Sequence, residues 1–301
     1  MNDLIIIGAG PAGITASVYA ARKRIDFMVI SKDIGGQAAW SGDIENYTGY
    51  QFITGPELSD KFEEHLRKFN IRVNEGEEAA ELKKTGDNIT VITNKGSYQA
   101  RSVIIASGKR TRQLNVPGEV EFKNKGLSYC ATCDAPFFSG KAVAVIGGGN
   151  SGLDAAIQLM RIASHIYLIN AAGQLTGDPI MQEAVKASDK VTVFNNTTVS
   201  LVSGDKFVTG ITIKNQDGEK KLDVQGVFVE IGLIPNSEFA ALVEKNESKE
   251  IKVNIYNETN VPGIFAAGDV TDVPEKQIII AAGEGSKAAL SVFRYLIQHK
   301  V

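Results

Sequence analysis

The two cysteines of this 301-residue chain, Cys130 and Cys133, stand in a C-x-x-C arrangement. A chain of this length with no other cysteine does not depend on disulfides for its stability, so we interpret the pair as chemically active. In such a pair the first thiol has a lowered pKa, and the second can resolve a mixed disulfide. The spacing therefore predicts thiol–disulfide exchange with another protein.

Two other interpretations of the cysteine pair, a structural zinc site and a pair of inert thiols, are less favoured. A structural zinc site needs about four ligands, whereas the three histidines, His65, His165 and His299, are scattered singly along the chain. We therefore expect no metal. Two buried, inert thiols are common in cytosolic proteins, but the C-x-x-C spacing of the only two cysteines favours chemistry over coincidence.

Two segments repeat one plan: a short apolar run, a G-x-G-x-x-G loop and a helix of small residues. The glycines are Gly8, Gly10 and Gly13 in the first segment, and Gly147, Gly149 and Gly152 in the second. The first glycine of such a loop permits a sharp bend, the second lets the backbone approach a pyrophosphate, and the third lets the helix pack on the strand. The phosphate then lies at a helix N-terminus, where free N–H groups favour an anion. Two such loops and a dithiol predict an electron path from a nicotinamide through a flavin to a disulfide.

Composition and charge exclude several classes of function. The chain has 32 Lys and Arg against 35 Asp and Glu, a net charge of −3 and no basic run, so binding to nucleic acid or to an anionic membrane is not expected. No apolar stretch reaches the roughly 18 residues of a membrane span. The first residues lack a basic region and a cleavage site, so we expect a cytoplasmic protein.

The elements that must position these residues follow from hydrophobic patterning. The apolar runs 4–7 and 143–146 are predicted strands, and the segments 14–21 and 153–160 are predicted helices. Residues 56–69 read as an amphipathic helix whose apolar face, Leu58, Phe62, Leu66 and Phe69, belongs to the core. Alternating runs at 89–92 and 208–214 predict strands of smaller sheets.

Four further motifs make a family resemblance specific: Gly35-Gly36-Gln37, Glu45-Asn46-Tyr47, Cys130-Ala131-Thr132-Cys133-Asp134 and Ala267-Gly268-Asp269. With the two glycine loops, they extend over essentially the whole chain. The chain resembles the low-molecular-weight thioredoxin reductases and the related reductase portion of the flavoprotein subunit of alkyl hydroperoxide reductase. The stretches 226–236 and 276–281 look more like the peroxide-system flavoprotein, although the sequence lacks that protein's N-terminal thioredoxin-like domains.

The resemblance implies an α/β fold with two Rossmann-like dinucleotide-binding domains, one inserted into the other. Residues 1–112 and 239–301 would form a discontinuous FAD-binding domain, and residues 113–238 a nicotinamide-type domain that carries the C-x-x-C. A homodimer is implied as well. Because the chain starts on the flavin-binding strand, the electron acceptor would be a separate protein, thioredoxin or a thioredoxin-like protein.

The resemblance also implies roles for individual residues. Cys133 would face the flavin, Cys130 would attack the partner's disulfide, and Asp134 would carry a proton to and from the dithiol; the alternative for Asp134 is a carboxylate stabilised at a helix N-terminus. The expected FAD-binding residues are Gly8, Gly10, Pro11, Ala12, Gly13, Gly36, Gln37, Asn46, Gly108, Gly268, Asp269, Gln277 and Ile278. The expected nicotinamide-binding residues are Gly147, Gly149, Asn150, Ser151, Gly152 and Asn170, and for the three glycines the alternative is inherited fold packing.

The electron donor departs from the family pattern. NADPH-dependent thioredoxin reductases carry a His-Arg-Arg segment after the second strand of the nicotinamide domain, but residues 170–175 here contain no cation. A 2′-phosphate requires bidentate Arg or clustered Lys, so NADPH is disfavoured. Asn170 can hydrogen-bond a free 2′-hydroxyl, which favours NADH. Reduced ferredoxin is an alternative donor, and a non-catalytic, nucleotide-binding thiol sensor is the alternative of a different class; Asp134 beside an intact dithiol favours the enzyme.

Overall fold

The computed structural model describes residues 1–41 and 43–299, and it divides the chain into two compact units. The first unit comprises Met1–Arg110 and Ile234–Val301, and the second, inserted between these segments, comprises Thr111–Leu233. Strands β9 (Lys109–Thr111) and β18 (Leu233–Pro235), which pair with each other, carry the chain from one unit to the other. The expectation that the first unit binds FAD and the second a nicotinamide nucleotide stays a prediction.

The first unit is built on a seven-stranded sheet with the strand order β5-β2-β1-β8-β7-β6, to which β19 adds by pairing with β8. The pairs β6–β7 and β7–β8 are antiparallel, and the other pairs of this sheet are parallel. Leu4, Ile5 and Ile6 in its middle strand are fully buried, as expected for a parallel strand covered on both faces. The bounds are β1 (Asn2–Ala9), β2 (Phe27–Ile34), β5 (Val73–Glu75), β6 (Ala79–Thr85), β7 (Asn88–Thr93), β8 (Ser97–Ile105) and β19 (Ile264–Ala266), with a small hairpin of β3 (Asp43–Ile44) and β4 (Ile53–Thr54).

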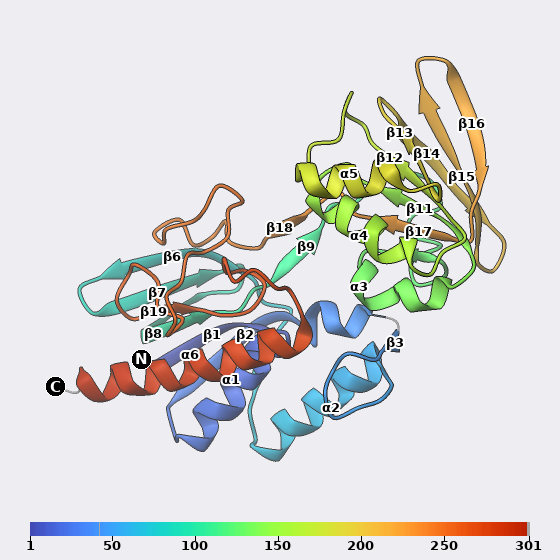
Figure 1. The fold of residues 1–301 in the computed structure, drawn as a ribbon. Coiled ribbons are helices and arrows are strands. Elements are labelled where there is room, and N and C mark those ends of the chain that lie inside the picture. The colour runs from blue at the N-terminus through green and yellow to red at the C-terminus, as the bar shows by residue number, and fades with distance from the viewer. Residues whose placement is uncertain (42, 300–301) are drawn as a thin grey trace. The chain divides into compact units, whose positions relative to one another are not determined.

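Helices α1 (Pro11–Arg22) and α6 (Ile278–Gln298) lie side by side against this sheet (Figure 1). Small residues allow the close approach, because a Cβ on Gly285 of α6 would lie 2.0 Å from the carbonyl oxygen of Ala12. Helix α1 begins three residues before its predicted start. Pro11 occupies the first helical position, where its fixed φ suits the helix and its missing N–H costs nothing.

Helix α2 (Gly55–Lys68) confirms the predicted amphipathic segment. It begins with a capping box, in which Thr54 accepts from the Glu57 backbone and Glu57 accepts from the Thr54 backbone. Leu58 and Leu66 are buried, and Phe62 packs against the same clusters. Phe69, also predicted on this face, follows the last helical residue and is only partly buried. A short 3₁₀ helix, η1 (Gly36–Trp40), packs nearby in the same unit.

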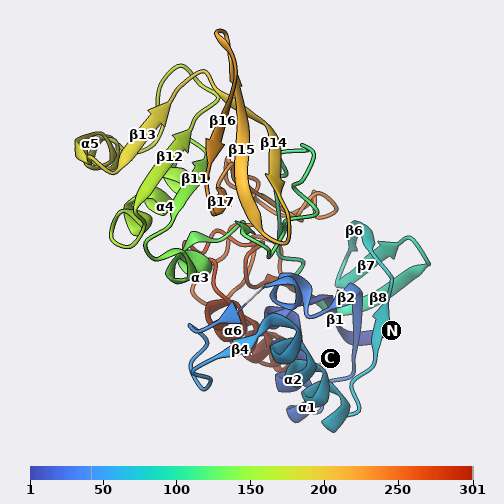
Figure 2. The ribbon, with the colours of Figure 1, turned by 90° about the vertical axis from the view of Figure 1, so that its right-hand side faces the viewer.

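The second unit contains a five-stranded parallel sheet of order β10-β17-β11-β12-β13 and an antiparallel three-stranded sheet of order β14-β15-β16, whose long ribbon is seen in Figure 2. The strands are β10 (Leu127–Ser128), β11 (Ala142–Ile146), β12 (His165–Ile169), β13 (Val191–Phe194), β14 (Thr198–Gly204), β15 (Val208–Asn215), β16 (Gly218–Asp223) and β17 (Gly226–Val229). The helices are α3 (Ala131–Asp134), η2 (Ala135–Phe138), α4 (Asn150–Met160) and α5 (Pro179–Ala187). The predicted α/β class with two Rossmann-like units is confirmed. In the described ranges, no helix is both long and apolar enough to cross a membrane.

Candidate functional site

The first glycine loop joins β1 to α1 with the geometry that its spacing predicts. Gly8 has φ +106°, and a Cβ there would lie 2.3 Å from the carbonyl oxygen of Ala106. A Cβ on Gly13 would lie 1.8 Å from the carbonyl oxygen of Gly8. Gly10 differs, because its Cβ would meet no atom closer than 4.0 Å. The glycine at this position therefore leaves space for a group outside the chain, as a pyrophosphate requires.

The second loop, between β11 and α4, repeats these three relationships. Gly147 has φ +137°, with the carbonyl oxygen of Glu230 2.1 Å from its Cβ position, and a Cβ on Gly152 would lie 1.9 Å from the carbonyl oxygen of Gly147. Gly149 faces open space, with only the Thr176 hydroxyl at 3.8 Å. Neither α1 nor α4 has a side-chain cap at its N-terminus. Both loops thus present uncapped helix ends suited to phosphate groups.

Contacts between distant segments of the first unit hold several of the predicted FAD-binding residues. A Cβ on Gly36 would lie 3.2 Å from Cα of Gly10, so the 3₁₀ helix η1 runs directly beside the loop. The side-chain amide of Gln37 donates to the carbonyl oxygen of Lys109. The Asn46 amide donates to the side-chain oxygen of Gln277, which precedes the first residue of α6, Ile278. The structure therefore joins segments that lie far apart in the sequence.

Gly268 and Asp269 follow β19 in this unit. A Cβ on Gly268 (φ +76°) would lie 2.9 Å from the Ala12 side chain, so this turn packs on the start of α1. Burial raises the pKa of the Asp269 carboxyl, while the positive charges of Lys276 and Lys109 act in the opposite direction. Gly108, with φ +65°, has no atom within 4 Å of its Cβ position. These positions are compatible with a ligand beside the loop.

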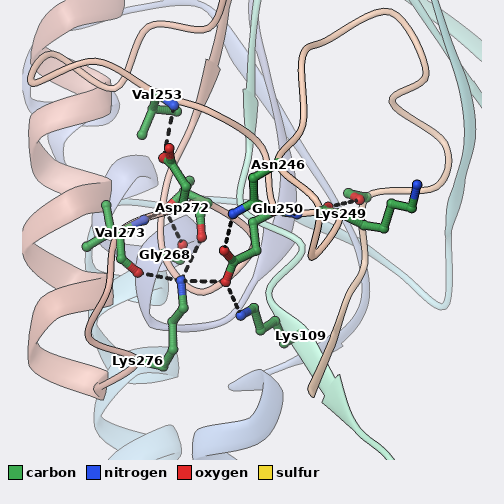
Figure 3. A network of polar contacts seen from close by, with 11 residues as sticks. Lys109, Asn246, Lys249, Glu250, Val253, Gly268, Asp272, Val273 and Lys276 are labelled. Carbon is green, nitrogen blue, oxygen red and sulfur yellow. Dashed lines mark hydrogen bonds and ion pairs between the residues drawn. The ribbon is translucent and has the colours of Figure 1, made fainter. Parts of the chain in front are cut away.

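A largely buried ion network that the sequence patterns did not indicate holds this region together (Figure 3). The Glu250 carboxylate pairs with Lys109, and with Lys276 at 3.3 Å. The Lys276 ammonium also donates to the backbone carbonyl oxygens of Thr271 and Val273. The network thereby fixes the segment between β19 and α6, which contains the predicted FAD-binding residues Gly268, Asp269 and Gln277.

A cavity of about 580 Å³ opens at the second loop, within the range of cofactor sites. Its wall includes most of the predicted nicotinamide residues: Gly147, Gly149, Asn150, Ser151 and Asn170. The remaining one, Gly152, lies directly behind the loop, beside Gly147. Among the described residues that line the cavity, none is a lysine or an arginine, and Glu230 is the charged one.

Asn170 lies on the cavity wall, but its amide group is already engaged. Its two N–H donors bind the carbonyl oxygen of Ala172 at 3.0 Å and the side-chain oxygen of Asn195 at 2.8 Å. Its side-chain oxygen accepts from the Ala172 backbone at 3.2 Å. A carbonyl oxygen has a second lone pair, so the function left to this side chain is acceptance of a bond from a hydroxyl.

The cysteines form a disulfide, with their Cα atoms 5.3 Å apart, at the start of α3. Both residues are partly exposed, as exchange with a partner requires. Asp134, the last residue of α3, follows Cys133 directly. The dithiol, the proton-carrying candidate and the second glycine loop therefore belong to one unit. In the described part of the chain, no group of His, Cys, Asp or Glu could hold a metal ion.

A family model described as pyridine nucleotide-disulphide oxidoreductase matches residues 2–285. The chain belongs to this family. It is 43% identical over 300 residues to a protein of Bacillus subtilis (strain 168) named NADH dehydrogenase, covering 99% of this chain and 59% of that one. It is 43% identical over 304 residues to a protein of Pseudomonas aeruginosa that is named as a subunit of alkyl hydroperoxide reductase, covering 98% of this chain and 58% of the relative. The chain thus spans a little under three fifths of the length of these relatives.

A solved structure of nearly equal extent adds to this assignment. Thioredoxin reductase from Streptococcus pyogenes MGAS5005 is similar with a TM-score of 0.93 and 37% identity, over 99% of both chains. The resemblance to thioredoxin reductases and to the peroxide-system flavoprotein is therefore confirmed. The pyridine nucleotide-disulphide oxidoreductase family, to which the chain belongs, is a family of flavoprotein oxidoreductases whose cofactors are FAD and a nicotinamide nucleotide. The open positions at Gly10 and Gly149, and the uncapped helices behind them, fit both dinucleotides.

Two glutamates whose carboxylates hold backbone segments of the second unit in place were not predicted from the sequence. Glu119 is buried and accepts from the backbone of Leu114 and Asn115, both at 2.7 Å, which fixes the chain beside the cavity. Glu230 follows β17, and its carboxylate accepts the Ala131 N–H at 3.1 Å, beside the disulfide. Its position in the sequence could have indicated a functional residue. Glu230 is a charged residue directly after an apolar strand, at the sheet edge where parallel folds of this kind bind their ligands.

Proposed function

We propose that the protein is a flavin-dependent disulfide reductase that passes electrons through FAD and the Cys130–Cys133 disulfide to thioredoxin or a thioredoxin-like protein. The observation that carries the proposal is the distribution of features between the two units. The second unit contains the disulfide, a nucleotide-sized cavity and a glycine loop, and the first unit contains a glycine loop with the same geometry as that of the second. The similarity to the streptococcal thioredoxin reductase supports the acceptor class.

The residues of this chain would divide the exchange reaction between them. FAD, when bound, would supply a two-electron carrier between the nicotinamide and the disulfide. Gly8, Gly10 and Gly13 would hold its pyrophosphate on α1, while Asn46 and Gln277 would orient the flavin side. Reduction breaks the S–S bond and gives two thiols. The Cys130 thiolate would attack the partner's disulfide, Cys133 would resolve the mixed disulfide, and Asp134 would return the proton.

For the donor, we favour NADH over NADPH. The cavity wall offers no lysine or arginine among its described residues to balance a 2′-phosphate. The side-chain oxygen of Asn170 retains one lone pair for a 2′-hydroxyl. The name of the Bacillus relative, NADH dehydrogenase, is consistent with this preference. In this proposal the protein is a cytoplasmic homodimer.

Anaerobic flavin reduction tests both parts of the proposal. Purified protein loaded with FAD is mixed with NADH, NADPH or reduced ferredoxin, and the 450 nm absorbance is followed before and after addition of oxidised thioredoxin. We expect NADH to bleach the flavin fastest and thioredoxin to restore it. A tenfold faster flavin reduction by NADPH than by NADH, about 1.4 kcal/mol in the transition state, would contradict the donor assignment. Bleaching by reduced ferredoxin and by neither nucleotide would identify ferredoxin as the donor instead.

Cysteine variants separate the flavin step from the exchange step. A Cys130→Ser and Cys133→Ser double variant contains no thiol, so its flavin should still be bleached by the donor but should not be reoxidised by thioredoxin. The Cys133→Ser variant alone should trap thioredoxin as a mixed disulfide on Cys130. Protein that cannot be reconstituted with FAD would favour the thiol-sensor function instead.

A further inference from the structure

The carboxylate of Glu230 is fixed beside the disulfide by a single backbone contact. Its Oε1 accepts the N–H of Ala131 at 3.1 Å, between residues 99 positions apart. This N–H belongs to the peptide bond that joins Ala131 to Cys130, at the first residue of α3. The position of the Glu230 carboxyl relative to the C-x-x-C turn is therefore set by the fold of the second unit alone.

The charged groups around Glu230 are predominantly acidic. Asp154 of α4 acts on Glu230 electrostatically, and its carboxylate accepts at 2.7 Å from Gln158, whose amide also reaches the Thr132 hydroxyl at 3.4 Å. Asp134 is the last residue of α3 and follows Cys133 directly in the sequence. Arg112 lies beside Gly232, with its Nε 3.9 Å from the Cβ position there. No ion pair within 4 Å joins Glu230 to a cation in the described ranges.

The environment of Glu230 makes its charge responsive near neutral pH. Burial raises the pKa of the Glu230 carboxyl to about 7; the hydrogen bond from Ala131 opposes this shift, and the negative charge of Asp154 adds to it. A simple structural acceptor for one N–H does not require an ionisable group, since a glutamine oxygen would serve equally well. The carboxyl group is therefore suited to a function that depends on its charge.

We propose that Glu230 is a positioning residue of the dithiol: its oxygen anchors the Ala131 N–H below the C-x-x-C turn, and its negative charge opposes formation of a thiolate at Cys130. The inference rests on the redox role of the cysteines proposed above. Reduction breaks the S–S bond and adds two electrons and two protons, giving two thiols. Loss of a proton from Cys130 then places a second negative charge near that of Glu230, which like charges disfavour. When Glu230 is protonated, this opposition disappears.

Alkylation of the reduced protein tests the charge directly. Full-length protein is reduced with dithiothreitol, freed of it, and reacted with iodoacetamide between pH 5 and 9.5, and Cys130 modification is followed by mass spectrometry. Glu230→Gln keeps an oxygen for the Ala131 N–H but removes the charge. We expect its Cys130 to react about threefold faster than wild type near pH 8, with a smaller difference at pH 9.5, because removal of the like charge lowers the Cys130 pKa by up to about one unit.

Two further variants complete the design. Glu183→Gln removes one exposed charge from α5 of the same unit and should leave the pH profile unchanged. Glu230→Ala removes both the charge and the acceptor, and should match Glu230→Gln in thiol pKa. A Glu230→Gln profile identical to wild type would overturn the proposal. A profile that changes in Glu230→Ala but not in Glu230→Gln would also overturn it, because such a result would show that Glu230 acts only as a hydrogen-bond acceptor.

The reduction potential of the disulfide gives a second, independent readout. In dithiothreitol buffers at pH 8, a threefold effect on the redox equilibrium corresponds to a midpoint about 14 mV less negative for Glu230→Gln than for wild type. At pH 5.5, where Glu230 and the thiols are protonated, the two midpoints should coincide. Neither measurement needs flavin, donor or partner protein. The two proposals can therefore fail separately. Absence of reductase activity would not change the expected thiol reactivity or midpoint, and an unchanged thiol reactivity would not exclude reductase activity.

Discussion

The side-chain amide of Asn46 donates a hydrogen bond to the side-chain oxygen of Gln277 across 3.0 Å, although 231 positions separate the two residues. Gln277 is the residue directly before α6, and Asn46 follows the short strand β3. The bond therefore fastens a loop near the N-terminus of the chain to the start of its last helix. Both residues are proposed to face the flavin, so this contact would shape the flavin side of the site before any ligand binds.

A double-mutant cycle measures what this contact contributes. We expect Asn46→Ala and Gln277→Ala each to weaken FAD binding, and the two changes together to cost less than their sum by about 1 kcal/mol, because the second change finds the bond already broken. FAD affinity is measured by flavin fluorescence during reconstitution. The exposed pair Lys83 and Glu81 serves as a control, and additive effects of Asn46 and Gln277 would contradict the coupling.

Two glycine-to-alanine changes distinguish a close backbone approach from an ordinary glycine. In Gly13→Ala, the new Cβ would lie 1.8 Å from the carbonyl oxygen of Gly8. We expect a loss of about 1–3 kcal/mol in the free energy of unfolding and a protein purified with little FAD. Gly283→Ala in α6 meets no atom within 4 Å, so it should stabilise the helix by about 0.5–1 kcal/mol. Urea unfolding and the 450 nm absorbance per chain give the comparison.

Introducing a cation should change the donor preference. Ala171 lines the cavity and is exposed, directly after Asn170. Ala171→Arg places a guanidinium where a 2′-phosphate would need a partner. We expect the ratio of NADPH to NADH rates of flavin reduction to rise about tenfold, which is about 1.4 kcal/mol. Ala171→Gln, of similar length but neutral, should leave the ratio near that of the wild type; an equal rise in both variants would show that charge is not the cause.

Glu230 also predicts how the stability of the oxidised protein depends on pH. Burial is the main cause that raises the pKa of its carboxyl from 4.5 to about 7. The folded protein therefore binds a proton between these values that the unfolded chain has lost, and the contribution of this group is full below about pH 4.5 and falls as the pH rises to 7. Urea unfolding at pH 5 and pH 8 should show a loss of a few kcal/mol in wild type that is absent from Glu230→Gln.

The local patterns of the sequence determined the loops and their elements. Gly8 and Gly13 could be predicted because their function depends on residues within one strand, turn and helix, and Gly147 and Gly152 repeat the same spacing. The C-x-x-C pair and the apolar face of residues 56–69 are local in the same way. The helix after each loop was placed three residues too late, at Ile14 instead of Pro11 and at Leu153 instead of Asn150. In α1 the reason is that Pro11 was assigned to the loop, although proline suits the first turn of a helix.

The tertiary structure alone decided which distant residues meet. Nothing in the sequence pairs Glu230 with Ala131, or Lys109 and Lys276 with Glu250, because each contact depends on how strands and loops far apart in the chain pack together. Burial is likewise a property of the folded chain, and it gives Glu230 a pKa that its residue type would not indicate. The sequence by itself determined that a C-x-x-C pair and two G-x-G-x-x-G loops between a strand and a helix are present. Only the fold decided which charged groups surround that dithiol, since electrostatic effects depend on distance and solvent exposure rather than on order along the chain.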